Sequence, residues 1–231
     1  MTTDPKQPPV TNCLTSPDID GLGSGPPSSE QGSCQHPPIK LGIMASGSGS
    51  NFEAIAQAIA RKELNATIEI VIYNNPMAKV AQRASRLGVP SKLMDHRTYE
   101  TREALDSAIA AQLKNYQVDW VIMAGWMRRV TQQLLSAFPE RILNIHPSLL
   151  PSFPGIRAVE QALAAQVKIT GCSVHLVELI VDSGPIIMQA AVPILPTDTP
   201  ATLQARIQAQ EHRIFPQAIA IAAQQTSQSL K

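Results

Sequence analysis

Short, almost wholly apolar stretches alternate with longer amphipathic segments along this chain from Ile39 onward. The apolar stretches are typical of strands covered on both faces, and they occupy residues 39–45, 68–73, 89–94, 118–124 and 142–145. The amphipathic segments predict helices at residues 52–62, 99–116 and 131–138, and one that starts at Pro76 and is closed by Gly88. This alternation predicts an α/β fold, Rossmann-like and doubly wound around a mainly parallel sheet.

The second half of the chain departs from this alternation of strands and helices. A helix that ends near Gln166 is followed by strands at residues 172–177 and 186–195, which we expect to pair antiparallel across a turn at residues 182–185. A last helix begins at Thr199, and it carries Gln208 and Glu211 three residues apart on one face. The sheet should therefore have an antiparallel C-terminal portion.

Residues 1–38 differ in composition from everything that follows them. They are rich in Pro, Ser, Thr and Gly, and Lys6 is their single basic residue. Such a segment buries too little apolar surface to offset its ordering entropy. We expect a disordered tail at residues 1–38 and one domain at residues 39–231. A start codon chosen too far upstream and a short partner-binding arm are the alternatives.

Charge and cysteine content narrow the classes of partner and compartment. The formal net charge is +1, which gives no broad attraction to nucleic acid or to a membrane surface. The longest uncharged apolar run, residues 120–127, is too short to span a bilayer, and no secretory signal opens the chain. Three cysteines without metal-ligand spacing suit a reducing compartment. We expect a cytoplasmic protein with small-molecule substrates, no metal, and no nucleic-acid or membrane partner.

Two polar side chains mark the end of the strand at residues 142–145. Asn144 and His146 lie two residues apart, so in an extended chain they project to the same side. Pro147 has no N–H and ends the sheet pairing there. An imidazole exchanges protons near neutral pH, and an amide NH₂ can donate to a developing oxyanion. The alternative is a structural histidine with its hydrogen bonds satisfied.

A glycine-rich turn follows the first strand and opens the first helix. In Ser46–Asn51, glycines let the backbone come close to a ligand, and the helix N-terminus favours an anion. The spacing matches neither a dinucleotide fingerprint nor a Walker loop. A single phosphate monoester, held at Gly49, Ser50 and Asn51, fits better. A tight turn with a helix cap is the alternative.

A third candidate region comprises Arg102 and the loop at residues 126–130. Arg102 lies near a helix start, where the dipole disfavours a cation, so it hints at an anionic ligand unless it is a solvated surface residue. Trp126 and Met127 either line a pocket for a flat ring or belong to the core. The loop at 126–130, the glycine turn and the Asn144–His146 turn all follow parallel strands, so they should meet at one sheet edge and form one active site.

Seven motifs, taken in order, resemble the phosphoribosylglycinamide formyltransferases, a family of folate-dependent enzymes. These motifs are Ser46–Asn51, Ala124–Arg128, Asn144–Pro151, Phe153–Gly155, Ser173–His175, Asp182–Pro185 and Gln208–His212. The resemblance covers about residues 40–220 and implies the formyltransferase fold. It also implies formyl transfer from 10-formyltetrahydrofolate to the amine of glycinamide ribonucleotide, a step of one-carbon metabolism in de novo purine biosynthesis. We expect a monomer or a homodimer.

The resemblance assigns roles residue by residue. It places the ribonucleotide phosphate at Gly49, Ser50 and Asn51. It places the folate at Arg102, Met127, Arg128, Arg129, Val130 and Asn144. It makes Asn144, His146 and Asp182 catalytic, and it gives the glycinamide end of the substrate to Gln208 and Glu211. His175 also matches the family. We expect it to be a structural residue or to contact the catalytic residues without contacting the substrates.

Three other kinds of protein share part of this pattern. A hydrolase that deformylates folate carries a similar Asn-x-His strand end but has a longer N-terminal regulatory domain. The tRNA formyltransferases carry a basic C-terminal domain, and neither group explains the phosphate turn. A non-catalytic folate or nucleotide binder would have no need of Asn144, His146 and Asp182 together. The chain departs from the family at residues 178–181, which are usually more acidic, and at residues 157–159.

Overall fold

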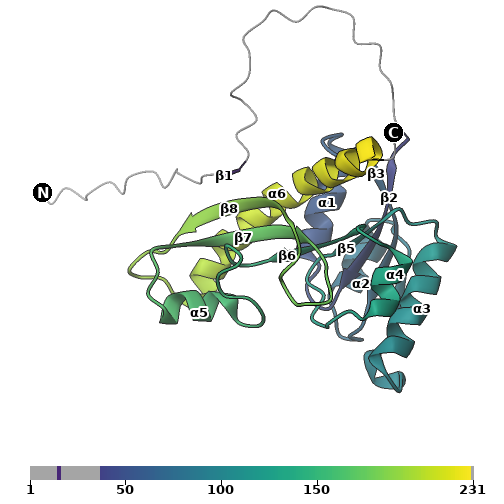
Figure 1. Ribbon diagram of the computed structural model, residues 1–231, viewed down its shortest axis with the longest axis horizontal. Coiled ribbons are helices and arrows are strands. Elements are labelled where there is room, and N and C mark those ends of the chain that lie inside the picture. The colour runs from purple at the N-terminus through teal and green to yellow at the C-terminus, as the bar shows by residue number, and fades with distance from the viewer. Residues whose placement is uncertain (1–14, 17–36, 230–231) are drawn as a thin grey trace, which may run out of the picture.

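One mixed sheet runs through the molecule and carries helices on both of its faces (Figure 1). The computed structural model describes residues 15–16 and 37–229. The parallel strands are β2 (Ile39–Ala45), β3 (Ala66–Tyr73), β4 (Ser91–Leu93), β5 (Trp120–Met123) and β6 (Ile142–His146). The antiparallel strands β7 (Ile169–Leu176) and β8 (Ile186–Pro193) complete the pattern that the sequence predicts.

The strand order is β1-β8-β7-β6-β5-β2-β3-β4. From β2 the chain first builds outward through β3 and β4, and it then returns to place β5 and β6 on the other side of β2. The strand order therefore reverses between β2 and β5, and ligands of open α/β sheets bind at the carboxyl edge of such a pair of strands. The predicted glycine turn and the loop at 126–130 follow β2 and β5 at this edge.

The two-residue strand β1 (Thr15–Ser16) pairs antiparallel with β8, opposite Ala190 and Gln189. It falls inside the segment that the composition predicts to be a disordered tail. The rest of that segment, apart from residues 37–38, lies outside the described residues.

The helices are α1 (Ser50–Ala60), α2 (Val80–Arg86), α3 (Arg102–Asn115), α4 (Gln132–Ala137), α5 (Ala158–Ala164) and α6 (Pro200–Ser229), with a 3₁₀ turn at His96–Thr98. The helix expected from Pro76 begins only at Val80. Asn75 explains the delay, because its side-chain oxygen accepts from the Met77 amide and its carbonyl accepts from the Ala78 amide. These bonds close a turn in place of the first helical turn.

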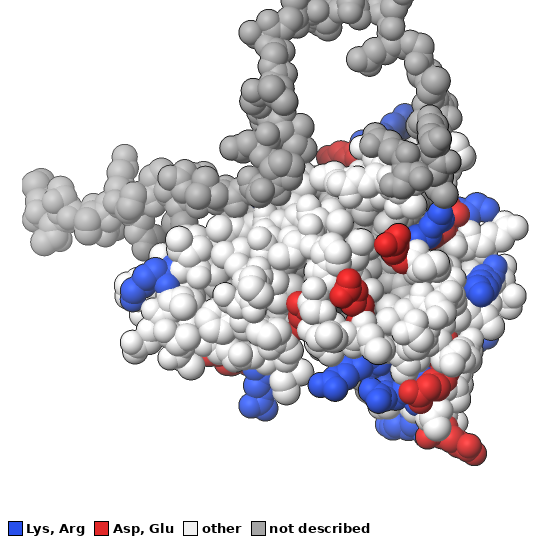
Figure 2. All heavy atoms as spheres, in the orientation of Figure 1, with Lys and Arg blue, Asp and Glu red and all other residues white. Residues whose placement is uncertain are grey.

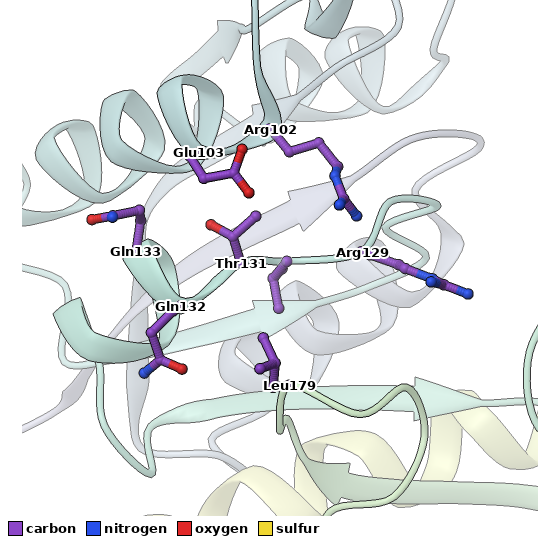
Figure 3. Close-up of a pocket in the computed structure, with 8 residues that line it drawn as sticks. Arg102, Glu103, Arg129, Thr131, Gln132, Gln133 and Leu179 are labelled. Carbon is purple, nitrogen blue, oxygen red and sulfur yellow. The ribbon is translucent and has the colours of Figure 1, made fainter.

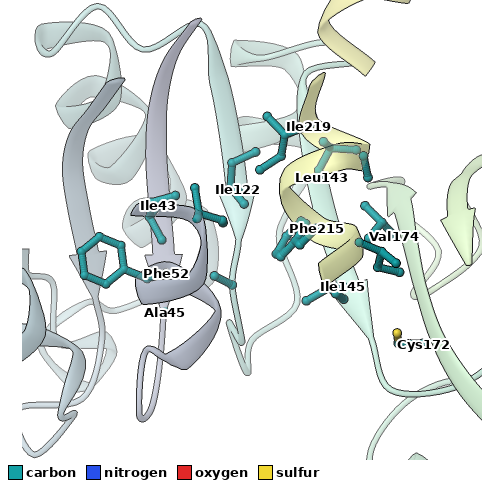
Figure 4. Close-up of a cluster of buried hydrophobic side chains, with 14 of the residues drawn as sticks. Ile43, Ala45, Phe52, Ile122, Leu143, Ile145, Cys172, Val174, Phe215 and Ile219 are labelled. Carbon is teal, nitrogen blue, oxygen red and sulfur yellow. The ribbon is translucent and has the colours of Figure 1, made fainter. Parts of the chain in front are cut away.

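Two apolar layers hold the helices against the sheet, one on each face. On one face Ile43 and Ala45 pack among Phe52 of α1 and Phe215 of α6 (Figure 4). On the other face Met44 packs in a separate cluster with side chains of α3 and α4. Because successive strand residues point to opposite faces, β2 contributes to both layers. Each large buried apolar side chain stabilises the fold by about 1.5–3 kcal/mol, so the sheet is a rigid base for its carboxyl edge.

The structure confirms the predicted fold class, a doubly wound and mainly parallel sheet with an antiparallel C-terminal portion. None of the helices in the described part of the chain is long and apolar enough to cross a membrane.

Candidate active site

Asp182 lies at the centre of the polar cluster beyond β6. Its Oδ2 lies 3.3 Å from His146 Nδ1, and its Oδ1 lies 3.6 Å from His175 Nε2. The backbone N–H of Gly155 donates to Oδ2 at 2.8 Å. His146 ends β6, His175 lies on the adjacent β7, and Asp182 follows in the loop between β7 and β8. The Asp182 carboxylate thus contacts residues of β6, of β7 and of the loop that contains Gly155.

Asn144 joins this cluster through His175. The Asn144 Nδ2 atom lies 3.1 Å from His175 Nε2, and the two residues face each other in the β6–β7 register. His175 Nδ1 lies 2.8 Å from the carbonyl oxygen of Leu176. Because a carbonyl oxygen only accepts, Nδ1 must carry a proton, and Nε2 is left to face Asn144 and Asp182. The structure therefore brings together Asn144, His146 and Asp182, the three residues predicted to be catalytic.

Burial and hydrogen bonding oppose each other at Asp182. Desolvation by burial raises the pKa of this carboxyl. The hydrogen bond from the Gly155 amide, together with the neighbouring rings of His175 and His146, lowers it more. The net pKa of Asp182 is below the ordinary value for an aspartate, so the group is ionised at neutral pH. A fixed negative charge therefore stands beside His146 Nδ1.

His146 meets an acceptor at each ring nitrogen. Its Nε2 donates to the Phe153 carbonyl oxygen at 2.9 Å, while its Nδ1 faces Asp182. The side chain is buried, with 6% of the residue exposed. A protonated imidazole is satisfied on both sides in this arrangement. To give a proton to a ligand, Nε2 has to exchange the Phe153 carbonyl for an oxygen of that ligand.

The glycine turn between β2 and α1 needs a glycine at position 49. Gly49 has φ +74°, and a Cβ placed there would lie 2.5 Å from Val80 Cγ2 and 3.0 Å from Val80 Cα. Without a side chain, Gly49 leaves the first amides of α1 uncapped. Free amides at a helix start, together with the helix dipole, form an anion site. Ser50 and Asn51, the other predicted phosphate ligands, are the first two residues of that helix.

Helix α6 reaches this turn through the two residues predicted to hold the glycinamide end. Gln208 Nε2 donates to Ser50 Oγ at 2.9 Å, and Asn51 Nδ2 donates to Glu211 Oε2 at 2.9 Å. Glu211 is 5% exposed, and burial raises the pKa of its carboxyl, although the hydrogen bond from Asn51 acts in the opposite direction. A buried acceptor of this kind suits an amine or amide donor. Hydrogen bonds therefore join the predicted phosphate residues to the predicted glycinamide residues.

The raised pKa of Glu211 predicts a gain in stability when this residue is replaced by glutamine. A group whose pKa is higher in the folded state stabilises the fold below its unfolded pKa, and that contribution is lost as pH rises through the folded value. At pH 7.5 Glu211→Gln should raise the free energy of unfolding by on the order of 1 kcal/mol, because no carboxylate is then buried. Denaturant unfolding at pH 7.5 and pH 4.5 measures this.

The gain should shrink at pH 4.5, where the wild-type carboxyl is protonated in the folded state. Glu160→Gln, on the exposed surface of α5, is the matched control and should change stability by less than about 0.5 kcal/mol. A Glu211→Gln variant that is less stable than wild type at pH 7.5 would contradict this account of the buried carboxyl.

Arg102, Arg129 and Val130 line a cavity of about 340 Å³ beside the start of α3. The remaining lining residues are Glu103, Thr131, Gln132, Gln133 and Leu179 (Figure 3). The Arg102 and Arg129 side chains extend toward the same side of the cavity, away from Gln132 and Gln133 (Figure 3). Lys and Arg side chains also gather on this part of the surface, near the start of α3 (Figure 2). The region is thus locally basic although the whole chain is nearly neutral.

Three predicted folate residues, Met127, Arg128 and Asn144, do not line this cavity. The Met127 side chain is 80% exposed, and its backbone N–H donates to Ser46 Oγ at 2.9 Å. That bond ties the loop after β5 to the turn after β2. The charge of Arg128 acts on the buried carboxyl of Asp106 beneath the loop. Trp126 is buried, so of the two apolar residues that the sequence offers for a pocket, one belongs to the core and the other projects into solvent.

Three features of the site carry a signal that is weak or lacking in the sequence. His175 lies between Asn144 and Asp182 because Asn144 and His175 are paired in the β6–β7 register. The hydrophobic pattern of the sequence does not predict this register. Asp106 Oδ2 accepts from the Thr131 amide at 2.5 Å and so holds α3 against the start of α4. Leu179 lines the cavity from the β7–β8 loop, within the segment that departs from the family pattern.

Comparison with known proteins agrees with this geometry. The Formyl transferase family model matches residues 39–219. Phosphoribosylglycinamide formyltransferase of Bacillus subtilis is 42% identical over 180 residues, which are 78% of this chain and 92% of that protein. The human trifunctional purine biosynthetic protein adenosine-3 is 41% identical over 189 residues, 82% of this chain but only 19% of that protein.

A solved structure extends the comparison to the fold. Glycinamide ribonucleotide transformylase 1 from Symbiobacterium toebii superposes with a TM-score of 0.81 at 47% identity, covering 86% of this chain and 93% of that one. The chain belongs to the formyl transferase family.

Proposed function

We propose that this enzyme transfers the formyl group of 10-formyltetrahydrofolate to the amine of glycinamide ribonucleotide. The products are formylglycinamide ribonucleotide and tetrahydrofolate, in de novo purine biosynthesis. The observation that carries the proposal is the clustering of Asn144, His146 and Asp182 at the sheet edge that also presents an anion-binding turn. The names of its relatives point to the same reaction.

In the proposed reaction Asn144 and His146 act on the formyl oxygen. The substrate amine forms a bond to the formyl carbon, and the carbonyl oxygen takes the negative charge of a tetrahedral intermediate. The Asn144 amide and the protonated His146 donate to this oxygen. His146 must first release the Phe153 carbonyl, to which its Nε2 donates in the structure. Catalytic hydrogen bonds commonly form only in the substrate complex.

Asp182 has two tasks in this proposal. Its ionised carboxylate keeps His146 Nδ1 facing it, which orients the ring. The same carboxylate can hold a water that takes a proton from the attacking nitrogen and delivers it to N10 as the bond from the formyl carbon to N10 breaks. The balance is one C–N bond formed, one C–N bond broken and one proton moved, and we propose no metal for this reaction. The formyl folate is a cosubstrate.

The substrate contacts follow the geometry of the surrounding loops. We assign the ribonucleotide phosphate to the amides of Gly49, Ser50 and Asn51, and the glycinamide end to Gln208 and Glu211. We assign the anionic tail of the folate to the basic cavity at Arg102 and Arg129. Val130 lines that cavity, and Met127, Arg128 and Asn144 complete the proposed folate contacts.

An assay of folate release tests the proposal and separates it from folate hydrolysis. The enzyme is incubated with 10-formyltetrahydrofolate, with and without glycinamide ribonucleotide, and tetrahydrofolate is followed with time. We expect release to depend on the ribonucleotide. Equal release in its absence would identify a deformylating hydrolase, and no release in either case would indicate a non-catalytic binder.

We also propose that residues 39–231 form the catalytic domain of a cytoplasmic monomer or homodimer without nucleic-acid or membrane partners, and that residues 1–38 are dispensable for catalysis. Strand β1 is added to β8, two strands away from β6. Deleting residues 1–38 should therefore leave kcat and both KM values within about twofold of the full chain, since only two described residue pairs are lost at the sheet edge. A tenfold fall in kcat/KM would show that the segment belongs to the enzyme.

A further inference from the structure

Helix α2 backs the glycine turn through contacts from one of its faces. The Val80 amide donates to the Gly47 carbonyl at 3.2 Å, and the Val80 side chain fills the space that a Cβ at Gly49 would need. One helical turn later, Arg83 Nε donates to the Ser48 carbonyl at 2.8 Å. Residues three apart share a helix face. Val80 and Arg83 thus hold the three residues before the first turn of α1.

Arg83 also neutralises an acid in that first turn. Its guanidinium forms an ion pair with Glu53, and Arg86 pairs with the same carboxylate. Arg83 and Glu53 are largely shielded, with 29% and 21% of their side chains exposed, whereas the Arg86 side chain is 62% exposed. Partly buried pairs are screened less by salt than exposed ones. Arg83 is therefore the more effective partner of Glu53.

Both contacts bear on the binding of an anion at the start of α1. An acid in the first turn stabilises an empty helix, but it repels a phosphate at the same N-terminus. The Ser48 carbonyl is a second negative end of a dipole next to the amides of Gly49 and Ser50. Arg83 engages both groups, so their negative ends are turned toward α2 and the amides remain available to a ligand.

We infer that Arg83 is a positioning residue for the ribonucleotide phosphate, acting through Ser48 and Glu53 without touching the substrate. This inference rests on the proposed function of the glycine turn. Arg86 shares only the contact with Glu53 and should contribute much less. A lysine at position 83 has one ammonium in place of the guanidinium fork, so it can engage Ser48 and Glu53 together less well.

Steady-state kinetics of Arg83→Ala, Arg83→Lys and Arg86→Ala test this inference. Loss of hydrogen bonds to a charged group predicts a rise of about tenfold or more in the KM for glycinamide ribonucleotide in Arg83→Ala. The folate KM and kcat should stay within about twofold. We expect a smaller rise in Arg83→Lys and a rise of less than about threefold in Arg86→Ala.

The nucleoside that lacks the phosphate provides a sharper control. With this substrate, Arg83→Ala and wild type should have the same kcat/KM, because no anion remains to be positioned. Protection of the melting temperature by inorganic phosphate, a readout without turnover, should also be lost in Arg83→Ala. If Arg83→Ala does not fold, the same comparisons are made with Arg83→Lys.

The outcomes separate this inference from the proposed function. A wild-type enzyme without ribonucleotide-dependent transfer overturns the proposed function itself. An active wild type whose Arg83 variants keep the ribonucleotide KM within twofold overturns the role of Arg83 alone. A rise that persists with the phosphate-free nucleoside also overturns it, because the effect would then be a general distortion of the site.

Discussion

His146→Ala lowers kcat by about two to four orders of magnitude, the range expected when a positioned proton donor is removed. The side chain stands at the end of β6 with Asp182 at one ring nitrogen and an exchangeable acceptor at the other. Alanine leaves the Asn144 amide as the donor from β6 to the oxyanion. The ribonucleotide and folate KM values should change little, because the residues proposed to bind the two substrates, including Asn144 on β6, are all retained. Single-turnover formyl transfer measures the loss directly.

His96→Ala is the matched control for this variant. His96 follows β4, and its Nδ1 lies 3.2 Å from the Asn74 carbonyl, so it too is a partly buried histidine bonded to the backbone. We expect its kcat to stay within about twofold of wild type, since it lies outside the proposed site. Thermal unfolding of both variants shows whether the fold survives. Retention of most activity in a folded His146→Ala protein would refute the assigned role.

Asp182→Asn should lower kcat by about a hundredfold or more, the scale of a lost acid–base or orienting group. The carboxylate accepts from the Gly155 amide while also facing His146 and His175. An asparagine has one acceptor oxygen, so its NH₂ must face one of these donors. The substitution also removes the negative charge that faces His146 Nδ1. The asparagine side chain is nearly the same size as that of aspartate, so the expected loss of kcat comes from the changes in charge and hydrogen bonding.

The difference in stability between wild type and Asp182→Asn should depend on pH. The pKa of Asp182 is lowered in the folded state, so its contribution to stability is present above the unfolded pKa and is lost as pH falls through the folded value. Wild type should therefore lose stability relative to Asp182→Asn below about pH 4. Asp182 stays ionised above that range, so its own titration should not change kcat near neutral pH.

Asp119→Asn is the corresponding control. Asp119 Oδ2 accepts from the Lys40 amide at 3.0 Å, at the opposite end of β2 and β5 from the site. An asparagine oxygen can keep that bond, and kcat should not change by more than about twofold. If Asp119→Asn and Asp182→Asn lower kcat equally, the effect of Asp182 is one of stability and not of catalysis.

The fold was largely predictable because its sequence signals are local. A strand buried on both faces is apolar throughout, as β5 is, and an amphipathic helix repeats its apolar residues, as α3 does. The family predicted from the ordered motifs is confirmed by the match over residues 39–219. The start of α2 was predicted at Pro76, because proline is common at the first position of a helix. The helix begins at Val80 instead, because the side chain of Asn75 closes a turn there.

The contacts within the site could be predicted less well than the fold, because they join segments that are far apart in the sequence. Glu211 reads as a surface charge between polar neighbours, yet it is buried because α6 packs against α1 and Asn51 donates to it across 160 positions of the chain. Asp182 reads as a turn residue, and only the resemblance to the family singled it out. Met127 lies outside the cavity at Arg102, and its role in folate binding remains a prediction.

Isotope tracing tests the central claim most directly. The enzyme is supplied with 10-formyltetrahydrofolate carrying ¹³C in the formyl group and with ¹⁵N-labelled amine on glycinamide ribonucleotide. Formation of a ¹³C–¹⁵N bond is followed by NMR in wild type and in His146→Ala. Our account predicts that wild type places the label on the ribonucleotide amine and that the variant forms this bond at least about a hundredfold more slowly. Label recovered as formate, or an equal rate in the two proteins, would contradict it.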